Sequence, residues 1–242
     1  MIFAAGLGTR LKPLTNTIPK ALVEVGGKPL LQHTIEKLTS AGFDEIIINI
    51  HHFGQQIINF IEENSRFGIR IEFSDEREQL LDTGGGIRKA AWFFDDNKPF
   101  LVHNVDIISS IDLGEVVNHH ASNNVMATLV CSRRETNRYL LFDKENHLSG
   151  WINKHTGETK SPHAGFHPSN YTHLAFSGIQ MLHPDLLREM ASFPDKFPII
   201  DFYLSMCATH TITAYQPTTG NILDVGKPDS IQQAAQFLTH FG

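Results

Sequence analysis

The sequence has few cysteines, no excess of positive charge and no long apolar run. Its two cysteines, Cys131 and Cys207, lie far apart and lack the spacing of metal ligands, so we expect two reduced, buried thiols. A net charge of −6 without a dense Lys/Arg block argues against a nucleic-acid-binding protein. No apolar run approaches the ~20 residues of a membrane span, and the N-terminus lacks a signal-peptide pattern. We therefore expect a cytoplasmic protein that binds neither nucleic acid nor a membrane.

What the chain does have is the composition of an ordinary globular protein, with 41% apolar and 19% charged residues. Its 242 residues can bury a large core, in one large α/β domain or in two small ones. Because internal repeats, low-complexity tracts and linkers are absent from the sequence, we predict a single domain over residues 1–242.

Strand and helix patterns alternate through the first half of the chain. The run Glu45–Ile50 is rich in isoleucine, which is typical of a strand covered on both faces. Further strand patterns fall at 2–4, 69–73 and 100–106, and helix patterns at 29–38, 54–64 and 84–94. This alternation predicts an α/β fold: a Rossmann-like, three-layer α/β/α arrangement with a mostly parallel central sheet. Ligands of such sheets bind beyond the carboxyl ends of the strands.

The second half of the chain is less regular. Strand patterns fall at 125–131, 174–182, 212–215 and 222–225, a hairpin pattern at 139–151, and helix patterns at 184–191, 198–208 and 228–241. Residues 153–171 are polar, rich in His, Gly and Pro, and have no period. A loop of this length is typical of a lid or of a disordered segment, so we predict a small β-hairpin and lid region.

The first thirty residues contain the pattern of an anion site. A short apolar strand leads into a turn with Gly6 and Gly8, and the cations Arg10 and Lys20 follow. Small residues after a strand let the backbone approach a ligand, and the N–H groups of such a turn can converge on phosphate oxygens. Two cations would add the charge that a polyanion needs when it leaves water. The turn alone is equally compatible with a surface loop that carries two solvated cations.

Taken together, the motifs of residues 4–30 resemble the signature of the sugar-1-phosphate nucleotidyltransferases. It reads Ala-Ala-Gly-Leu-Gly-Thr-Arg-Leu-x-Pro-Leu-Thr from Ala4, then Pro19-Lys20, then Gly27-Lys28-Pro29-Leu30. The resemblance implies the nucleotide-diphospho-sugar transferase fold, with a triphosphate-binding half at about 1–130 and a sugar-phosphate-binding half at about 131–242. It also implies catalytic roles for Arg10 and Lys20, and nucleotide binding by Ala4, Ala5, Gly6, Gly8 and Thr9. That family usually has more apolar residues before this motif, so we expect a late start or a trimmed N-terminus.

A second glycine-rich segment, Asp82-Thr83-Gly84-Gly85-Gly86, precedes the helix pattern that ends near residue 94. Three glycines would let a flat base approach the backbone, although a flexible turn would have the same composition. The resemblance implies nucleobase contacts by Asp82, Gly84 and Gly85. The segment is most similar to the N-acetylmuramate-1-phosphate uridylyltransferase branch, which has Glu where Asp82 stands. The mannose-1-phosphate guanylyltransferase branch is also similar, so UTP is the favoured donor, with GTP or CTP possible.

Two aspartates end or interrupt apolar strand patterns. Asp106 follows Val102-His103-Asn104-Val105, and Asp224 lies between Leu223 and Val225, where a carboxylate is costly to bury without a cation or donors. A strand-end aspartate can also simply cap the next loop. The resemblance implies that Asp106 and Asp224 hold Mg²⁺, which prefers carboxylate oxygens together with substrate phosphates and water. It further implies that Asn104 contacts the nucleotide.

The acceptor side carries a weaker pattern. The family that the chain resembles often has Glu-Lys before the lid, and here Asn153-Lys154 stands in that place. The segment Ala175-Phe176-Ser177-Gly178-Ile179 is similar to the strand that lines the sugar pocket. The resemblance therefore implies that Asn153, Lys154, Ser177 and Gly178 bind the sugar phosphate. The adjacent pairs His51-His52 and His119-His120 would not point at one metal from a strand or helix, which favours polar surface or packing.

These patterns predict an Mg²⁺-dependent enzyme that joins a nucleoside triphosphate to a sugar 1-phosphate and releases pyrophosphate, as a monomer or homodimer. One alternative is a cytidylyltransferase acting on choline phosphate or another alcohol phosphate, because the N-terminal motif does not report on the acceptor. Another, of a different class, is a catalytically silent nucleotide-sugar-binding regulatory protein. The intact set Arg10, Lys20, Asp106 and Asp224 argues against that alternative, because a sensor need not keep a full metal site.

Overall fold

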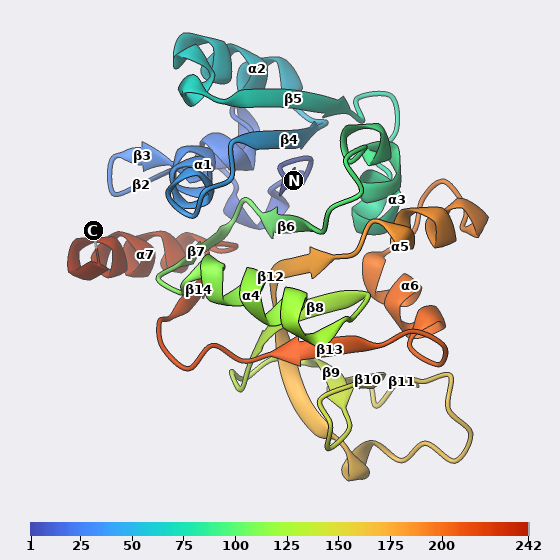
Figure 1. Ribbon diagram of the computed structural model, residues 1–242. Coiled ribbons are helices and arrows are strands. Elements are labelled where there is room, and N and C mark those ends of the chain that lie inside the picture. The colour runs from blue at the N-terminus through green and yellow to red at the C-terminus, as the bar shows by residue number, and fades with distance from the viewer. Residues whose placement is uncertain (242) are drawn as a thin grey trace. The chain divides into compact units, whose positions relative to one another are not determined.

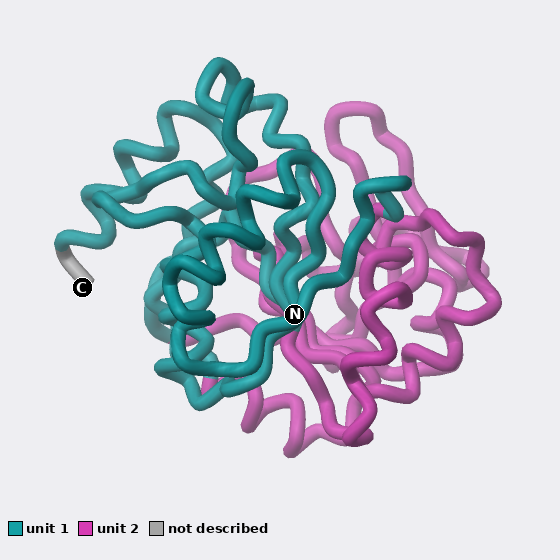
Figure 2. Tube along the Cα trace, turned by 90° about the horizontal axis from the view of Figure 1, so that it is seen from above, with its two compact units in different colours: residues 1–81, 102–113, 219–242 teal, residues 82–101, 114–218 magenta. Residues whose placement is uncertain are grey.

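Two units divide the chain, and neither is continuous in sequence. The computed structural model describes residues 1–241. Unit 1 comprises residues 1–81, 102–113 and the segment from 219 onward, and unit 2 comprises residues 82–101 and 114–218 (Figure 2). The predicted single domain over the whole chain stays a prediction.

Unit 1 contains the first strands and helices of the chain together with the last ones (Figure 1). Its elements are β1 (Ile2–Phe3), β2 (Glu24–Val25), β3 (Lys28–Pro29), α1 (Leu30–Ser40), β4 (Glu45–Ile50), α2 (Gly54–Glu63), β5 (Arg70–Asp75), most of β6 (Phe100–Asn104), β7 (Ile107–Ser109), β14 (Ile222–Asp224) and α7 (Pro228–Phe241). The strands β6, β1, β4 and β5 lie side by side in that order, and all of them run parallel.

The apolar patterns of unit 1 are buried as expected. In β4, Ile46, Ile47, Ile48 and Ile50 are all buried, because helical crossovers connect the parallel strands and cover both faces of the sheet. In α1, the predicted face of Leu31, Ile35 and Leu38 is buried as well. The carboxyl ends of these strands therefore lie at one edge of the sheet, and the loops after β1, β5 and β6 start there.

Unit 2 is built around antiparallel strands. Its elements are α3 (Asp82–Lys89), α4 (Leu113–Asn123), β8 (Ala127–Ser132), β9 (Arg138–Phe142), β10 (Leu148–Asn153), β11 (Thr159–Lys160), β12 (Thr172–Leu182), α5 (Asp185–Glu189), α6 (Ile199–Met206) and β13 (Ile212–Tyr215). The strand β12 pairs antiparallel with both β8 and β9, and β10 pairs antiparallel with β9 and β11, whereas β13 runs parallel to β8. The α/β class and the added hairpin region are confirmed.

Several boundaries differ from the sequence-based expectation. The strand β6 ends at Asn104, so Asp106 lies in the turn before β7 rather than at the strand end. The helix α3 begins at Asp82, two residues before the predicted start at residue 84, and it ends at Lys89 rather than near residue 94. Residues 153–171 contain the short strand β11 and a single 3₁₀ turn at Pro168–Asn170.

Both cysteines are free thiols, as expected. Cys131 is buried, and burial raises the pKa of its thiol far above the usual value. Cys207 is only half-buried, and burial raises its pKa to about 11. Among the described residues, every helix is too short or too polar to cross a membrane.

Candidate active site

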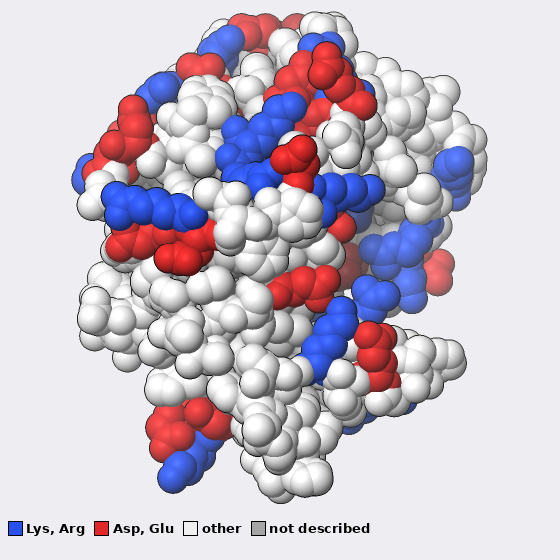
Figure 3. Space-filling model, turned by 90° about the vertical axis from the view of Figure 1, so that its right-hand side faces the viewer, with Lys and Arg blue, Asp and Glu red and all other residues white. Residues whose placement is uncertain are grey.

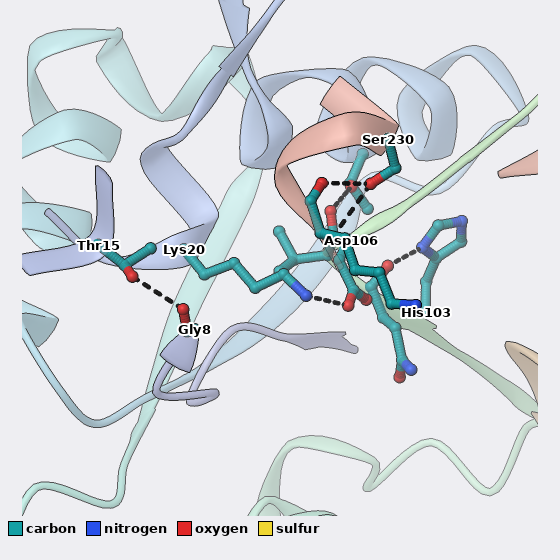
Figure 4. A network of polar contacts seen from close by, with 10 residues as sticks. Gly8, Thr15, Lys20, His103, Asp106 and Ser230 are labelled. Carbon is teal, nitrogen blue, oxygen red and sulfur yellow. Dashed lines mark hydrogen bonds and ion pairs between the residues drawn. The ribbon is translucent and has the colours of Figure 1, made fainter. Parts of the chain in front are cut away.

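The glycine turn of residues 5–9 follows β1 in unit 1 and folds back over Thr15 and Lys20. Gly8 has a φ of +63°, in the left-handed region that favours glycine. A Cβ at Gly8 would lie 2.9 Å from Thr15 Cγ2 and 3.0 Å from Lys20 Cβ, which leaves no room for a larger residue. The Thr15 hydroxyl donates to Gly8 O (2.8 Å), so the turn is fixed in this position (Figure 4).

The first two residues of the predicted nucleotide loop have their N–H groups already in use. Ala4 N and Ala5 N both donate to Asn49 Oδ1, over 2.7 and 3.2 Å. Their part at this site is therefore to hold the loop, and a phosphate would need other donors. Gly6 and Thr9 are exposed and follow directly in the chain.

Lys20 lies against Asp106. The Lys20 ammonium forms an ion pair with Asp106 Oδ2, and only 11% of the Lys20 side chain and 18% of the Asp106 side chain are exposed (Figure 4). Lys20 begins a 3₁₀ turn directly after Pro19, whose backbone is extended. A cation thus occupies one of the two carboxylates that the sequence assigns to a metal.

Asp106 and Asp224 are neighbours although 118 positions separate them in the chain. The strand β7, which starts directly after Asp106, pairs antiparallel with β14, and Ile107 lies opposite Asp224. In addition, Val225 N donates to Asp106 O over 2.8 Å. The expectation that Asp224 is buried in its strand was wrong, because Asp224 is exposed and its carboxylate is open to water.

Arg10 lies beside the same strand end. A Cβ on Gly226 would lie 2.7 Å from Arg10 Nη2 and 2.7 Å from Asp224 Oδ1. Real Cβ atoms do not come this close to other heavy atoms, so glycine at position 226 leaves the room in which both side chains lie. Arg10, Lys20, Asp106 and Asp224, which the sequence singled out separately, are thereby brought together within unit 1.

The donor set fits a hard divalent cation. Asp106, in the turn before β7, and Asp224, at the end of β14, supply carboxylate oxygens as ligands, and the Lys20 ammonium shows that this position attracts positive charge. Among the described residues, no group of three or more His, Cys, Asp or Glu side chains is arranged to hold a metal ion. A cation bound between Asp106 and Asp224 would therefore take its remaining ligands from water and from substrate oxygens.

The predicted nucleobase segment is packed tightly in unit 2. Gly84 N and Gly85 N both donate to Phe197 O, over 2.9 and 3.3 Å, and the Thr83 hydroxyl accepts from Ile199 N. A Cβ at Gly84 would lie 2.2 Å from the Phe197 ring. Packing against Phe197 thus explains the glycine at position 84, and Asp82 is exposed at the start of α3.

The predicted acceptor residues also lie in unit 2. The Lys154 ammonium lies 4.6 Å from the centre of the Tyr139 ring. Asn153 Oδ1 accepts from His155 N (3.0 Å), which is the role of a turn residue. Gly178 has a φ of +76° where the pairing of β12 with β8 is irregular, and the neighbouring Ser177 hydroxyl is buried without a partner among the described residues.

Asn104 and His103 end β6 in unit 1. Asn104 is half-buried, and its carbonyl accepts a hydrogen bond from His103 Nδ1 (2.8 Å). Burial lowers the pKa of His103 to about 4, so its ring is neutral at physiological pH. Acidic and basic side chains are interspersed on the face shown in Figure 3, in keeping with the modest net charge of −6.

Sequence reasoning missed two residues of this site. Asn49 is a buried polar residue in a strand whose other buried residues are four isoleucines, and that contrast is a usable signal. Gly226 follows Asp224 and Val225, and nothing local in the sequence indicates that Arg10 would lie across it.

Known proteins resemble the chain in both sequence and fold. An N-acetylmuramate α-1-phosphate uridylyltransferase from Caulobacter vibrioides is 44% identical over 110 residues, which are 45% of this chain and 45% of that protein. A mannose-1-phosphate guanyltransferase from Yarrowia lipolytica is 36% identical over 137 residues, 56% of this chain and 38% of that protein. These matches thus span less than half of the relatives' own length.

The solved structure of a UDP-glucose pyrophosphorylase from Acinetobacter baumannii has a TM-score of 0.78 at 19% identity, and the alignment covers 98% of this chain and 91% of that one. A likeness at this identity establishes the fold. The family model described as nucleotidyl transferase matches residues 1–240, and the chain therefore belongs to the nucleotidyl transferase family.

Proposed function

We propose that the protein transfers a nucleoside monophosphate from a nucleoside triphosphate to a sugar 1-phosphate, with release of pyrophosphate. The observation that carries this proposal is the cluster of two cations and two carboxylates at the strand ends of unit 1, next to a glycine turn. A transfer between two polyanions needs such a cluster, because both substrates must come together although their charges repel.

The reaction joins an oxygen of the sugar phosphate to the α-phosphorus, and the bond between the α- and β-phosphates breaks. The attacking oxygen is already anionic at neutral pH, so the protein need not supply a general base. Its residues act by position and charge. Arg10 would hold the departing pyrophosphate, and Lys20 would neutralise the α-phosphate or the acceptor phosphate.

Asp106 and Asp224 would hold Mg²⁺, which when bound supplies positive charge to the phosphate oxygens. The ion pair in the protein bears on this step. Lys20 holds one oxygen of the Asp106 carboxylate, so a metal would either share that carboxylate with the ammonium or displace it, and a displaced ammonium would be free to contact a phosphate.

We favour UTP as the donor, since a uridylyltransferase is among the most similar relatives at 44% identity. GTP stays the second candidate because of the guanyltransferase at 36% identity. Asp82, Gly84 and Gly85 are our candidates for base contacts, and Asn153, Lys154, Ser177 and Gly178 for the sugar phosphate. We further infer that the enzyme is cytoplasmic, which its two free thiols support. We also infer that it acts as one domain and is a monomer or a homodimer.

A pyrophosphate-release screen tests the proposal. UTP, GTP, CTP and dTTP are each combined with a panel of sugar 1-phosphates and with choline phosphate, in Mg²⁺ and in EDTA. We expect release with one sugar 1-phosphate and UTP, and none in EDTA. Release with choline phosphate alone would favour the alcohol-phosphate alternative. Nucleotide-sugar binding without any release would favour a regulatory protein.

A further inference from the structure

A buried polar chain connects two loops of unit 1 that the proposed reaction uses. It runs from the N–H groups of Ala4 and Ala5 through the Asn49 side chain to the Glu76 carboxylate, and from there to Leu81 N–H. We call this chain the Asn49–Glu76 relay. Ala4 and Ala5 start the glycine turn, and Leu81 directly precedes Asp82.

Every link of the relay is a hydrogen bond of ordinary length. Asn49 Oδ1 accepts from Ala4 N (2.7 Å) and Ala5 N (3.2 Å), and Asn49 Nδ2 donates to Glu76 Oε1 (2.8 Å). The second carboxylate oxygen, Glu76 Oε2, accepts from Leu81 N (3.0 Å). Both side chains are buried, with 3% of Asn49 and 0% of Glu76 exposed, so water does not replace these bonds.

The sheet explains why the relay spans this distance. In the parallel register, Asn49 lies opposite Phe3, one residue before Ala4, and opposite Ser74, two residues before Glu76. Glu76 is itself fixed by its backbone, since Glu76 N donates to Ile50 O (2.8 Å) and Glu76 O bonds His51 Nδ1 (2.7 Å). Three neighbouring strand ends therefore share one rigid row of polar groups.

The chemistry of the relay specifies both residue types. Ala4 and Ala5 present donors, so Asn49 must turn its oxygen toward them and its NH₂ toward position 76. Position 76 then needs an acceptor for Asn49 and a second acceptor for Leu81 N–H, which a carboxylate supplies and a carboxamide does not. We propose that Asn49 and Glu76 are positioning residues that hold the glycine turn and the segment entering residue 82 in the geometry that binds the nucleoside triphosphate. This inference rests on the proposed function.

Reciprocal exchange tests the relay. Asn49→Asp replaces the hydrogen bond to Glu76 with two carboxylates that repel each other. Glu76→Gln places an NH₂ donor next to another donor, which is either Asn49 Nδ2 or Leu81 N–H. In the double variant, the new carboxylate at position 49 accepts from Ala4 N, Ala5 N and the new NH₂ at position 76. The amide oxygen at position 76 then accepts from Leu81 N. All four bonds return at unchanged net charge.

We expect each single variant to raise the KM for the triphosphate roughly ten- to hundredfold with a smaller change in kcat, as befits a lost buried hydrogen bond. In the double variant, the KM for the triphosphate should return to within a few-fold of the wild-type value. Ser74→Ala is the matched control, because Ser74 is equally buried on β5 and its hydroxyl has no partner among the described residues. Assays are run well below the unfolding midpoint of each variant.

Hydrogen exchange at residues 4–9 and 77–83, measured without substrate, separates the relay from the reaction. Faster exchange in both single variants and its reversal in the double variant are expected. Unchanged exchange and KM in the single variants would overturn the relay, as would a double variant as impaired as the single ones. If the variants show this exchange pattern but the wild type releases no pyrophosphate in the screen, the proposed function alone is overturned.

Discussion

The Lys20 ammonium and the Asp106 carboxylate form an ion pair across 86 positions of the chain, and both side chains are largely buried. Two neighbouring carboxylates without a metal repel each other, and a cation paired with one of them reduces that repulsion. Under the proposed function, Lys20 would stabilise the Asp106 carboxylate before a metal binds and would contact the substrates afterwards.

Replacing Lys20 with Ala should change metal binding and turnover in opposite directions. Turnover should fall by roughly two to three orders of magnitude, since the variant lacks a cation that acts most strongly in the transition state. Mn²⁺, used as a spectroscopic probe for Mg²⁺, should bind more tightly, because no ammonium competes for Asp106. Electron paramagnetic resonance titration gives the affinity, and pyrophosphate release gives the rate. Near-normal turnover would show that Lys20 is merely a loop cation.

The two aspartates should differ in their effect on stability, although we expect turnover to need both. Asp106→Ala leaves the largely buried Lys20 ammonium without its partner and should lower the free energy of unfolding by about 1–3 kcal/mol. Asp224→Ala removes an exposed carboxylate and should change it by about 0.5 kcal/mol or less.

Urea unfolding without metal measures this difference between the aspartates. Asp106→Ala combined with Lys20→Met serves as the control, since it removes both charges and should recover much of the stability. Equal losses in the two single variants would mean that the ion pair does not stabilise the fold.

The sequence predicted those helices and strands whose apolar pattern extends over enough residues to show a period. The isoleucine run of β4 and the Leu31–Ile35–Leu38 face of α1 are buried where expected. The ribbon of β2 and β3 was missed, because each strand has only two residues and its turn depends on positive φ at Gly26 and Gly27. The helix α4 was missed as well, since Leu113–Asn123 mixes β-branched, polar and apolar residues.

The site was predictable residue by residue, whereas its geometry was not. The resemblance named Lys20, Asp106 and Asp224, but the pairing of β7 with β14, three residues each, has no local signal. The same holds for the Asn49–Glu76 relay, since Asn49 and Glu76 meet only through the register of β4 and β5. Contacts of this kind arise from tertiary packing.

Stability should fall in acid in part through His120, a buried residue of α4 whose Nδ1 bonds the Thr128 hydroxyl (3.0 Å). Burial, and then the charges of His183 and His119, lower the pKa of His120 from 6.5 to about 4. Between these values the unfolded chain binds a proton that the folded protein does not, so stability is full above pH 6.5 and falls toward pH 4. The loss due to this residue should reach about 3 kcal/mol.

Urea midpoints at pH 7, 6 and 5 measure this loss, and His120→Gln should show a shallower decline than the wild type. His103, whose pKa is lowered similarly, should contribute the same loss of stability in acid to both proteins, so the difference between them is due to His120. An equal slope for the two proteins would mean that His120 is not kept neutral by the fold.

Gly226→Ala should impair turnover through Arg10 rather than through the fold. The added Cβ would lie 2.7 Å from both Arg10 Nη2 and Asp224 Oδ1, which are ends of side chains and can move aside. We therefore expect a nearly unchanged unfolding midpoint but a kcat/KM lowered roughly a hundredfold, the scale of a group displaced by about 1 Å. A double-mutant cycle with Arg10→Ala identifies the route, because an effect that runs through the guanidinium vanishes once the guanidinium is gone. If Gly226→Ala costs as much in the Arg10→Ala background as in the wild type, then the glycine acts on Asp224 instead, and weaker Mn²⁺ binding by the single variant would accompany that outcome.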